Sequence, residues 1–217
     1  MARNKYPEET RQLILDVARK LFLEKGYDDT TIQDIIDGLG GLTKGVIYHH
    51  FKSKEDIFNQ LMIAIDKRSE EEFLKLSDLT DLTGLEVLQY FLTETIKKYE
   101  MLSTLYLGQI LQKSNRMIGD AYIDLWHTAI PDFKKLVQDG INDGSIVTEF
   151  PDEAVEALVI LANIWIGIQM PNWKPEELKR RFIVLKKVME ALDVPIVTDE
   201  TLTAVDTLCE FLANIKK

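Results

Sequence analysis

The strongest structural signal in this chain lies between residues 31 and 54. Thr31 can cap a helix through its hydroxyl, and Asp34, three residues later, completes the pattern of a capping box. Apolar residues then recur at three- and four-residue intervals: Ile32, Ile35, Ile36 and Leu39. This spacing gives a helix one apolar face, so the segment predicts a short helix that packs against a core.

A sharp corner and a second helix are expected next. Gly38, Gly40 and Gly41 supply the permissive backbone that a tight turn between helices requires. Thr43 has a side chain suited to cap the following helix. The inner face of that helix would be formed by Val46, Ile47 and Phe51. Two short helices at a tight corner form a helix-turn-helix, whose second helix enters the major groove, so the segment predicts contact with double-stranded DNA.

Charge within the segment supports this prediction. No acidic residue occurs between Gly38 and Lys54, and the outward positions carry donors suited to phosphates or base edges. These donors are Lys44, Tyr48, His49, Lys52 and Lys54. A plain solvated helix surface is the alternative interpretation. We expect no metal site, since the adjacent His49 and His50 cannot place both rings on one helical face.

An ordered set of motifs fills the first quarter of the chain. An amphipathic helix is expected from Glu8 to Lys25, and Gly26-Tyr27 follows it. The further motifs are Thr30-Thr31-Ile32, Thr43-Lys44-Gly45, Tyr48, His50-Phe51 and Lys52-Ser53-Lys54. In this order, the motifs resemble those of the TetR-type bacterial transcriptional regulators. The resemblance implies an all-α protein with an N-terminal three-helix, helix-turn-helix DNA-binding domain over residues 1–54. A larger C-terminal helical domain, residues 55–217, would bind a ligand and form a dimer.

The resemblance also implies particular DNA contacts. The contact positions of the family fall on Thr31, Thr43, Lys44, Tyr48 and Lys54, and we add Gly45, His49 and Lys52 from the same surface. The corner departs from the family pattern by one additional residue, in the run from Asp37 to Thr43. Either the first helix of the pair is longer, or the turn bulges on its glycines, and either change would alter the angle of the recognition helix.

The net charge of −10 is unusual for a protein that binds a polyanion. Residues 1 to 55 contain as many basic as acidic side chains, so the acidic excess lies in the remainder of the chain. An acidic body would suppress indiscriminate DNA binding and would favour contact through a small, well-oriented surface.

Cysteine usage and hydropathy bound the cellular context. A single cysteine, Cys209, excludes an intrachain disulfide and suits a reducing cytoplasm. The N-terminus lacks the apolar core of a signal peptide. The most apolar segment, Ala154 to Met170, is interrupted by polar residues and is too short and too polar for a membrane span. We expect a soluble cytoplasmic protein with no membrane partner.

Helical patterns continue beyond residue 55 without a competing strand pattern. The expected helices cover about residues 53–76, 84–99, 102–113, 117–140, 152–169, 175–192 and 200–215, with a kink or break near Pro131. The run from Ala154 to Gly167 is apolar on most sides, so a helix here must be buried on both faces. Either a second subunit covers one face, or this is the central helix of a monomer's core.

We favour a homodimer. Its interface would include Ala157, Leu161, Ile164 and Trp165. The small residues Ala157, Ala162 and Gly167 of this helix would permit close approach of another helix. A twofold dimer would place two recognition helices in successive major grooves, so the operator should be near-palindromic.

Aromatic and methionine side chains in the middle of the chain suggest a ligand cavity. The candidates are Tyr106, Tyr122, Trp126, His127, Trp165 and Met170. Such residues line apolar ligand sites, although they are more common as plain core. A ligand would be small and mostly apolar or aromatic. We expect no cofactor and no enzymatic activity, since the chain has no glycine-rich phosphate loop, nucleophile elbow or zinc-binding His/Glu spacing.

These patterns together predict a ligand-responsive, homodimeric repressor that binds a near-palindromic operator. Two alternatives stay open at this stage. A protein partner could control a DNA-binding regulator whose C-terminal core is filled. An interaction adaptor could retain the helix-turn-helix shape without binding DNA, because the body is acidic and the corner is lengthened. Activation in place of repression is also open, since the operator's position in the genome decides the sign.

Overall fold

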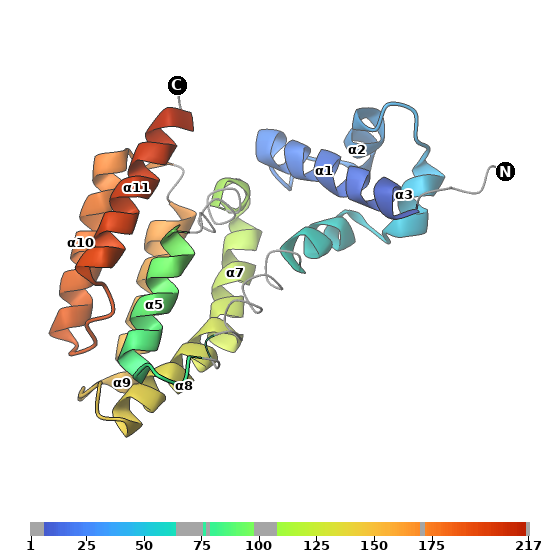
Figure 1. The fold of residues 1–217 in the computed structure, drawn as a ribbon. Coiled ribbons are helices and arrows are strands. Elements are labelled where there is room, and N and C mark those ends of the chain that lie inside the picture. The colour runs from blue at the N-terminus through green and yellow to red at the C-terminus, as the bar shows by residue number, and fades with distance from the viewer. Residues whose placement is uncertain (1–6, 64–75, 77–78, 98–107, 170–171, 216–217) are drawn as a thin grey trace. The chain divides into compact units, whose positions relative to one another are not determined.

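The computed structural model describes residues 7–63, 76, 79–97, 108–169 and 172–215, and this part of the chain contains helices and no strand (Figure 1). The all-α prediction is therefore confirmed for the described residues. Two ligand-site candidates, Tyr106 and Met170, lie outside them. The bounds of the helices in chain order are α1 Pro7–Lys25, α2 Ile32–Gly38, α3 Lys44–His50, α5 Gly84–Lys97, α7 Asn115–His127, α8 Ala129–Asn142, α9 Pro151–Ile160, η2 Leu161–Ile168, α10 Pro175–Ala191 and α11 Asp199–Ile215.

The chain divides into two compact units, Met1–Glu72 and Phe73–Lys217. The first unit thus extends beyond residue 54, where the sequence placed the boundary. The reason lies in residues 54–63, which are helical and which we name the connector helix. Its side chains Ile57 and Phe58 are buried, and the ring of Phe58 packs on rings of α1 and the turn after it. The start of the connector helix is therefore core of the N-terminal unit.

The first unit is built on α1, whose inner face buries Ile14, Leu15, Ala18 and Phe22. Gly26 ends this helix, because its φ of +89° suits glycine and its N–H donates to the carbonyl of Phe22 at 3.0 Å. Apolar residues from the other helices complete the core: Ile35 of α2, Ile47 of α3, and Phe51, Ile57 and Phe58 beyond it. Small helices gain most of their stability from such packing.

The second unit is a bundle in which helices distant in sequence lie side by side (Figure 1). α10 packs on α11, α11 on α5, α5 on α8, and α8 on α9. The core of this unit includes Leu88, Val155, Phe182, Leu185 and Val205. These helices build the unit expected to hold a ligand and a partner subunit.

Two features of the bundle depart from ordinary helix geometry. The helix expected over residues 117–140 breaks at Thr128, where φ is −122° and ψ is −75°. Pro131 follows in the first turn of α8, where the proline's missing N–H breaks no helical hydrogen bond. Further along, α9 continues as the π-helix η2, which the sequence did not predict. The side-chain amide of Asn163 donates to the carbonyl of Val159 at 2.9 Å and satisfies that acceptor at the transition.

Candidate nucleic-acid interface

A capping box fixes the start of α2, as the sequence predicted. Thr31 Oγ1 accepts from the N–H of Asp34 at 3.1 Å, and Asp34 Oδ2 accepts from the N–H of Thr31 at 2.8 Å. The same carboxylate bonds the Thr31 hydroxyl at 2.7 Å and pairs with Lys25 Nζ at 2.6 Å. Lys25 first, and then Thr31, hold the pKa of Asp34 well below its ordinary value. The hydroxyl of Thr31 is therefore engaged within the protein itself.

The lengthened corner is accommodated by the turn and not by a longer helix. α2 ends at Gly38, and the N–H of Leu39 donates to the carbonyls of Ile35 and Ile36, both at 3.1 Å. Gly40 and Gly41 then take φ angles of +63° and +129°, which residues with a Cβ rarely adopt. The additional residue is absorbed by this pair of glycines.

Helix α3 presents a polar, basic face on an apolar anchor. Ile47 and Phe51 are fully buried, whereas the ring of Tyr48 is 48% exposed. Lys44 Nζ lies 5.8 Å from the centre of that ring. Thr43 caps α3 by position, but its hydroxyl makes no capping hydrogen bond, which leaves it open to other partners. The cluster of exposed residues, which we name the reading surface, is Thr43, Lys44, Gly45, Tyr48, His49 and Lys52.

The two adjacent histidines lie in different environments. His49 is exposed, whereas His50 is mostly covered, and their rings are 5.1 Å apart. His50 Nε2 is buried and has no hydrogen-bond partner among the described residues. Burial first, and then the nearby His49, lower the pKa of His50, which disfavours the protonated ring. His49 is thus the histidine available to a phosphate or a base.

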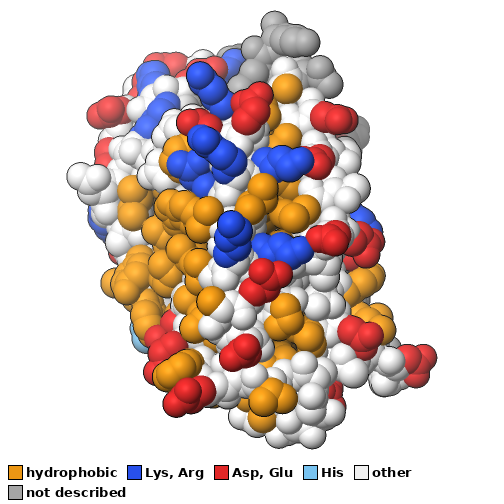
Figure 2. Space-filling view, turned by 90° about the vertical axis from the view of Figure 1, so that its left-hand side faces the viewer, with side chains coloured by type: hydrophobic (Ala, Val, Ile, Leu, Met, Phe, Trp, Pro, Cys, Tyr) orange, Lys and Arg blue, Asp and Glu red, His pale blue; other side chains and the backbone are white. Residues whose placement is uncertain are grey.

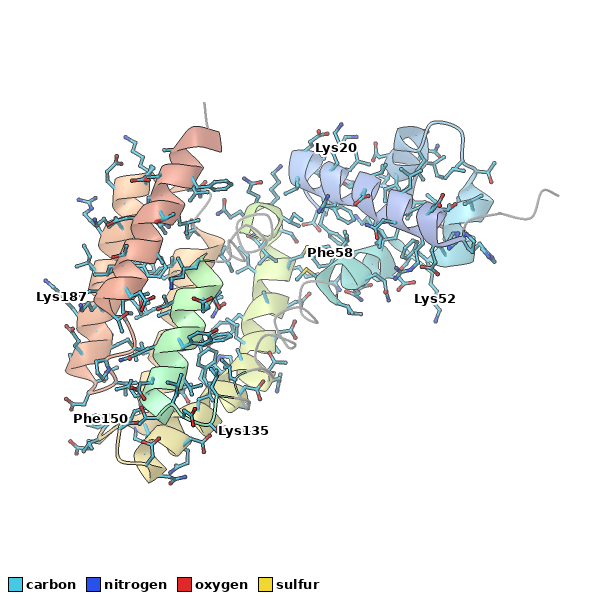
Figure 3. All side chains as sticks on the ribbon, viewed as in Figure 1. Lys20, Lys52, Phe58, Lys135, Phe150 and Lys187 are labelled. Atoms are coloured by element: carbon cyan, nitrogen blue, oxygen red, sulfur yellow. The ribbon has the colours of Figure 1, made fainter. Side chains whose placement is uncertain are left out.

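Lys54 differs from the other predicted DNA contacts. Its Nζ donates to the carbonyl of Tyr27 at 2.6 Å and to that of Asp28 at 3.3 Å. The ammonium also lies 4.3 Å from the centre of the Tyr27 ring. By contrast, Lys52 is exposed and its side chain points away from the helices of its unit (Figure 3). The structure therefore gathers six of the eight predicted residues on the reading surface and ties Thr31 and Lys54 to internal partners.

Of the predicted ligand residues that the structure describes, those on α7 lie on an exposed face, whereas Trp165 packs on the core. Tyr122 and Trp126 are 44% and 38% exposed, and their rings stack edge to face at 6.2 Å on α7. His127 at the end of α7 is also exposed. Trp165 instead packs against the core from η2, with the guanidinium of Arg181 5.6 Å from its ring. Residue type alone could not tell which face of α7 looks outward.

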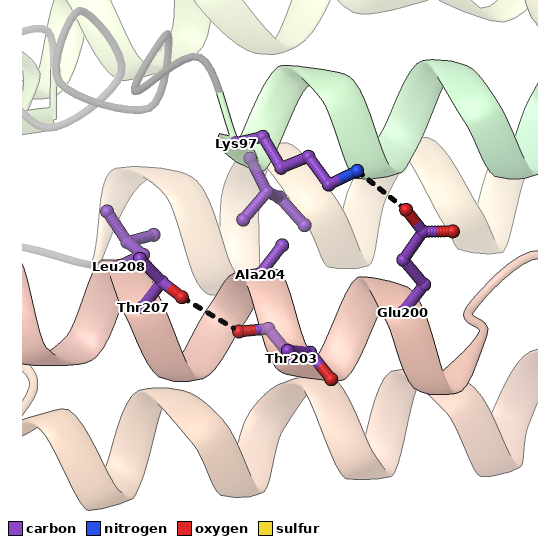
Figure 4. A pocket seen from close by; sticks show the side chains of 7 residues that line it. Lys97, Glu200, Thr203, Ala204, Thr207 and Leu208 are labelled. Carbon is purple, nitrogen blue, oxygen red and sulfur yellow. Dashed lines mark hydrogen bonds and ion pairs between the residues drawn. The ribbon is translucent and has the colours of Figure 1, made fainter.

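A groove of about 280 Å³ lies between α5 and α11 (Figure 4). Its apolar lining comes from Ile96, Ala204 and Leu208, and Lys97 Nζ pairs with Glu200 Oε1 at 2.6 Å beside it. The sequence did not single out this groove, because its residues come from helices about a hundred positions apart. Its volume lies near the lower limit of small-molecule sites, roughly 300–1,000 Å³.

The predicted interface residues occupy one stretch of α9 and η2. Ala157, Leu161, Ile164 and Trp165 are each half-buried, which is intermediate between core and open surface. Figure 2 shows the side of the second unit on which α10 lies in Figure 1, where hydrophobic side chains gather beside lysine and arginine side chains. Gatherings of this kind are typical of surfaces that a second protein covers.

Metal-binding clusters and membrane-spanning helices would each point to another class of function. The described residues contain no group of three or more histidine, cysteine or carboxylate side chains that could hold a metal ion. No helix in the described ranges is long and apolar enough to cross a membrane.

Comparison with known proteins connects this geometry to a family. Residues 14–61 match the family model of bacterial regulatory proteins of the tetR family. The transcriptional regulator AcrR of Shigella flexneri is 46% identical over 54 residues, which cover 25% of each chain. The transcriptional regulator QacR of Staphylococcus aureus is 26% identical over 156 residues, which cover 67% of this chain and 82% of QacR. The chain therefore matches a quarter of AcrR and most of QacR.

Solved structures extend the likeness of the fold to nearly the whole chain. A gamma-butyrolactone receptor, an ArpA-like protein, superposes with a TM-score of 0.58 at 19% identity and covers 96% of this chain and 99% of its own. Salmonella enterica GusR superposes with a TM-score of 0.61 at 18% identity, over 87% and 98% of the two chains. The fold and the reading surface define a helix-turn-helix protein. Residues 14–61 carry the match to the tetR family, and the chain is similar to TetR-type transcriptional regulators.

Proposed function

We propose that this protein is a homodimeric, ligand-responsive repressor that binds a near-palindromic operator through its reading surface. The observation that carries the proposal is the exposed, basic face of α3, anchored from below by Ile47 and Phe51. No acidic residue from Gly38 to Lys54 opposes a phosphate there. Lys44, Tyr48, His49 and Lys52 offer donors for phosphates and base edges.

The dimer is supported by the half-buried apolar residues of α9 and η2. A helix that is apolar on most sides leaves a face that its own subunit does not cover fully. A twofold axis through this face would fix the distance between the two reading surfaces. The operator would then have the same twofold symmetry as the protein. The protein would act in the cytoplasm, where the operator is.

Regulation by a ligand requires that the ligand bind two conformations of the dimer with different affinities. A small apolar or aromatic molecule that enters the second unit would move the connector helix and change the spacing of the reading surfaces. A panel of such molecules, tested for a rise in melting temperature and for release of operator, checks this part. Stabilisation without operator release would contradict it.

A second candidate function is control of the same DNA-binding activity by a protein partner. The exposed rings of Tyr122 and Trp126 favour it, since exposed aromatic side chains are enriched at protein interfaces. Failure of every apolar compound to raise the melting temperature would shift the balance toward this candidate.

Substitutions on the reading surface test the proposed DNA contact. Lys44→Ala and Tyr48→Ala should each weaken binding to a selected operator duplex about tenfold or more, which is typical of a lost base or phosphate contact of about 1–3 kcal/mol. Fold and oligomeric state should stay unchanged, because both side chains are exposed. Lys20→Ala, which removes an exposed lysine of α1, is the matched control. Equal affinity of all three variants and the wild type would rule out the reading surface.

A further inference from the structure

The ammonium of Lys54 is directed into its own unit. Lys54 is the first residue of the connector helix, yet its Nζ donates to two carbonyls of the turn between α1 and α2, residues 26–31. These acceptors are Tyr27 O at 2.6 Å and Asp28 O at 3.3 Å, and the Tyr27 ring lies 4.3 Å below the charge. A lysine has three N–H donors, so most of its hydrogen-bonding capacity is used inside the protein.

The turn that Lys54 contacts is itself rigidly held. Thr30 is fully buried, and its hydroxyl donates to the carbonyl of Gly26 at 2.6 Å. The ring of Tyr27 packs against Phe22 at 5.4 Å and against Phe58 at 5.2 Å. The ammonium of Lys54 therefore lies against an aromatic cluster that Tyr27 forms with Phe22 of α1 and Phe58 of the connector helix.

Release of Lys54 toward DNA would be costly. Two charge-assisted hydrogen bonds and a cation–π contact would be broken. The carbonyls of Tyr27 and Asp28 would each lose the Lys54 donor, and that of Tyr27 would keep only the N–H of Thr30 at 3.3 Å. Burial lowers the pKa of Lys54, which agrees with an ammonium drawn away from water. Lys52, two residues earlier, is exposed and points outward, so the same stretch of chain already offers a lysine to a phosphate.

We propose that Lys54 is a positioning residue and not a phosphate contact. It fixes the start of the connector helix to the turn between α1 and α2. Phe51, at the end of α3, is only a short step along the chain from Lys54, so this attachment holds α3 in one orientation. The inference rests on the proposed function, since positioning matters only if α3 binds DNA.

Salt dependence separates the two roles. Each phosphate contact that is lost lowers the slope of log affinity against log salt by about 1. We compare the wild type, Lys54→Met and Lys52→Met on one operator duplex, at a temperature where circular dichroism shows all three to be folded. Lys52→Met should weaken binding with a reduced slope. Lys54→Met should weaken binding about tenfold or more and keep the wild-type slope.

Two results would overturn the inference while leaving the proposed function intact. One is a slope for Lys54→Met that falls as it does for Lys52→Met, which would make Lys54 a phosphate contact. The other is wild-type affinity in folded Lys54→Met, which would make its role merely structural. Absence of wild-type binding to any duplex would instead overturn the proposed function, and this inference with it.

A double-mutant cycle with the aromatic ring gives a second readout. Tyr27→Leu removes the ring under the ammonium and should weaken operator binding with an unchanged salt slope. The double variant Tyr27→Leu/Lys54→Met should lose less binding free energy for the operator than the sum of the losses in the two single variants, because both substitutions remove the same interaction. With Tyr27 in place, Lys54→Arg keeps a cation over the ring and should bind the operator more tightly than Lys54→Met. Additive losses would contradict the proposed link.

Discussion

At the scale of single residues, the carboxylate of Asp34 shows how one side chain serves both a helix and its neighbour. It caps α2 through Thr31 and pairs with Lys25 at the end of α1. Both interactions need the ionised form, which explains why the pKa of Asp34 is lowered from its ordinary value of 3.8. The start of α2 is therefore sensitive to acid.

The sign of the pH dependence follows from the direction of this shift. A carboxyl whose pKa is lower in the folded state stabilises the fold above its ordinary pKa of 3.8, and this stability is lost as the pH falls below that value. We expect the carboxyl carbon resonance of Asp34 to titrate below 3.8, and Lys25→Met to raise the midpoint, because Lys25 is the largest cause. A wild-type midpoint at the ordinary value, or no change in the variant, would contradict this account.

The residue scale is also where sequence patterns reached their limit. They placed Thr43, Lys44, Gly45, Tyr48, His49 and Lys52 in one exposed cluster, because helical spacing and buried anchors fix which side faces out. They could not show that Lys54 turns toward Tyr27, since that bond joins positions 27 apart in the sequence. Long-range hydrogen bonds leave no periodic signal.

At the scale of helices, the crossing of α5 and α8 depends on Gly84, which lies against the backbone of Gly140. A Cβ on Gly84 would overlap the backbone of Gly140, so the two helices could not approach as they do. The N–H of Gly84 also donates to Asp143 Oδ2 at 2.7 Å, which caps the start of α5 from the turn after α8. Close backbone approach and capping thus act at the same place.

Gly84→Ala should destabilise the second unit by about 1–3 kcal/mol, the usual cost of overpacking. Urea denaturation measures the change in the free energy of unfolding. Gly119→Ala is the matched control, because a Cβ at this position of α7 meets nothing within 4 Å. That variant should gain up to about 1 kcal/mol, since alanine is the better helix former. Equal stability of the two variants would refute the role of the crossing.

Helix starts were predictable where a local capping signal exists. Thr31 with Asp34, and Thr83 with Glu86, form the expected reciprocal hydrogen bonds. Ser53 Oγ accepts from the N–H of Asp56, whereas the Asp56 carboxylate accepts from the N–H of Lys52. The π-helix η2 was not predictable, because its sequence continues the apolar pattern of α9 without a break. Packing of the whole bundle, and not local preference, decides the winding there.

At the scale of the whole molecule, the proposed dimer joins two reading surfaces. Ile164→Asp should yield a folded monomer in analytical ultracentrifugation, because a carboxylate in an apolar interface costs its hydration. Operator affinity should fall about 100-fold or more, since the two reading surfaces would no longer be linked in one dimer. Val147→Asp is the control, because Val147 is 79% exposed in the turn before α9.

If Ile164→Asp fails to fold, Ala157→Arg tests the same face with a residue that does not belong to the hydrophobic core cluster. A stable dimer in folded Ile164→Asp and Ala157→Arg would place the interface elsewhere. Loss of the dimer in Val147→Asp would show that the effect is not specific to α9 and η2.

The central claim is that the reading surface recognises a DNA sequence. Selection of bound duplexes from a random library by the wild-type protein, repeated across salt concentrations, tests it most directly. The account predicts enrichment of a near-palindrome whose two halves lie about one helical turn apart or a multiple of it, with binding that weakens as salt rises. A folded dimer that enriches no sequence at any salt concentration would contradict it.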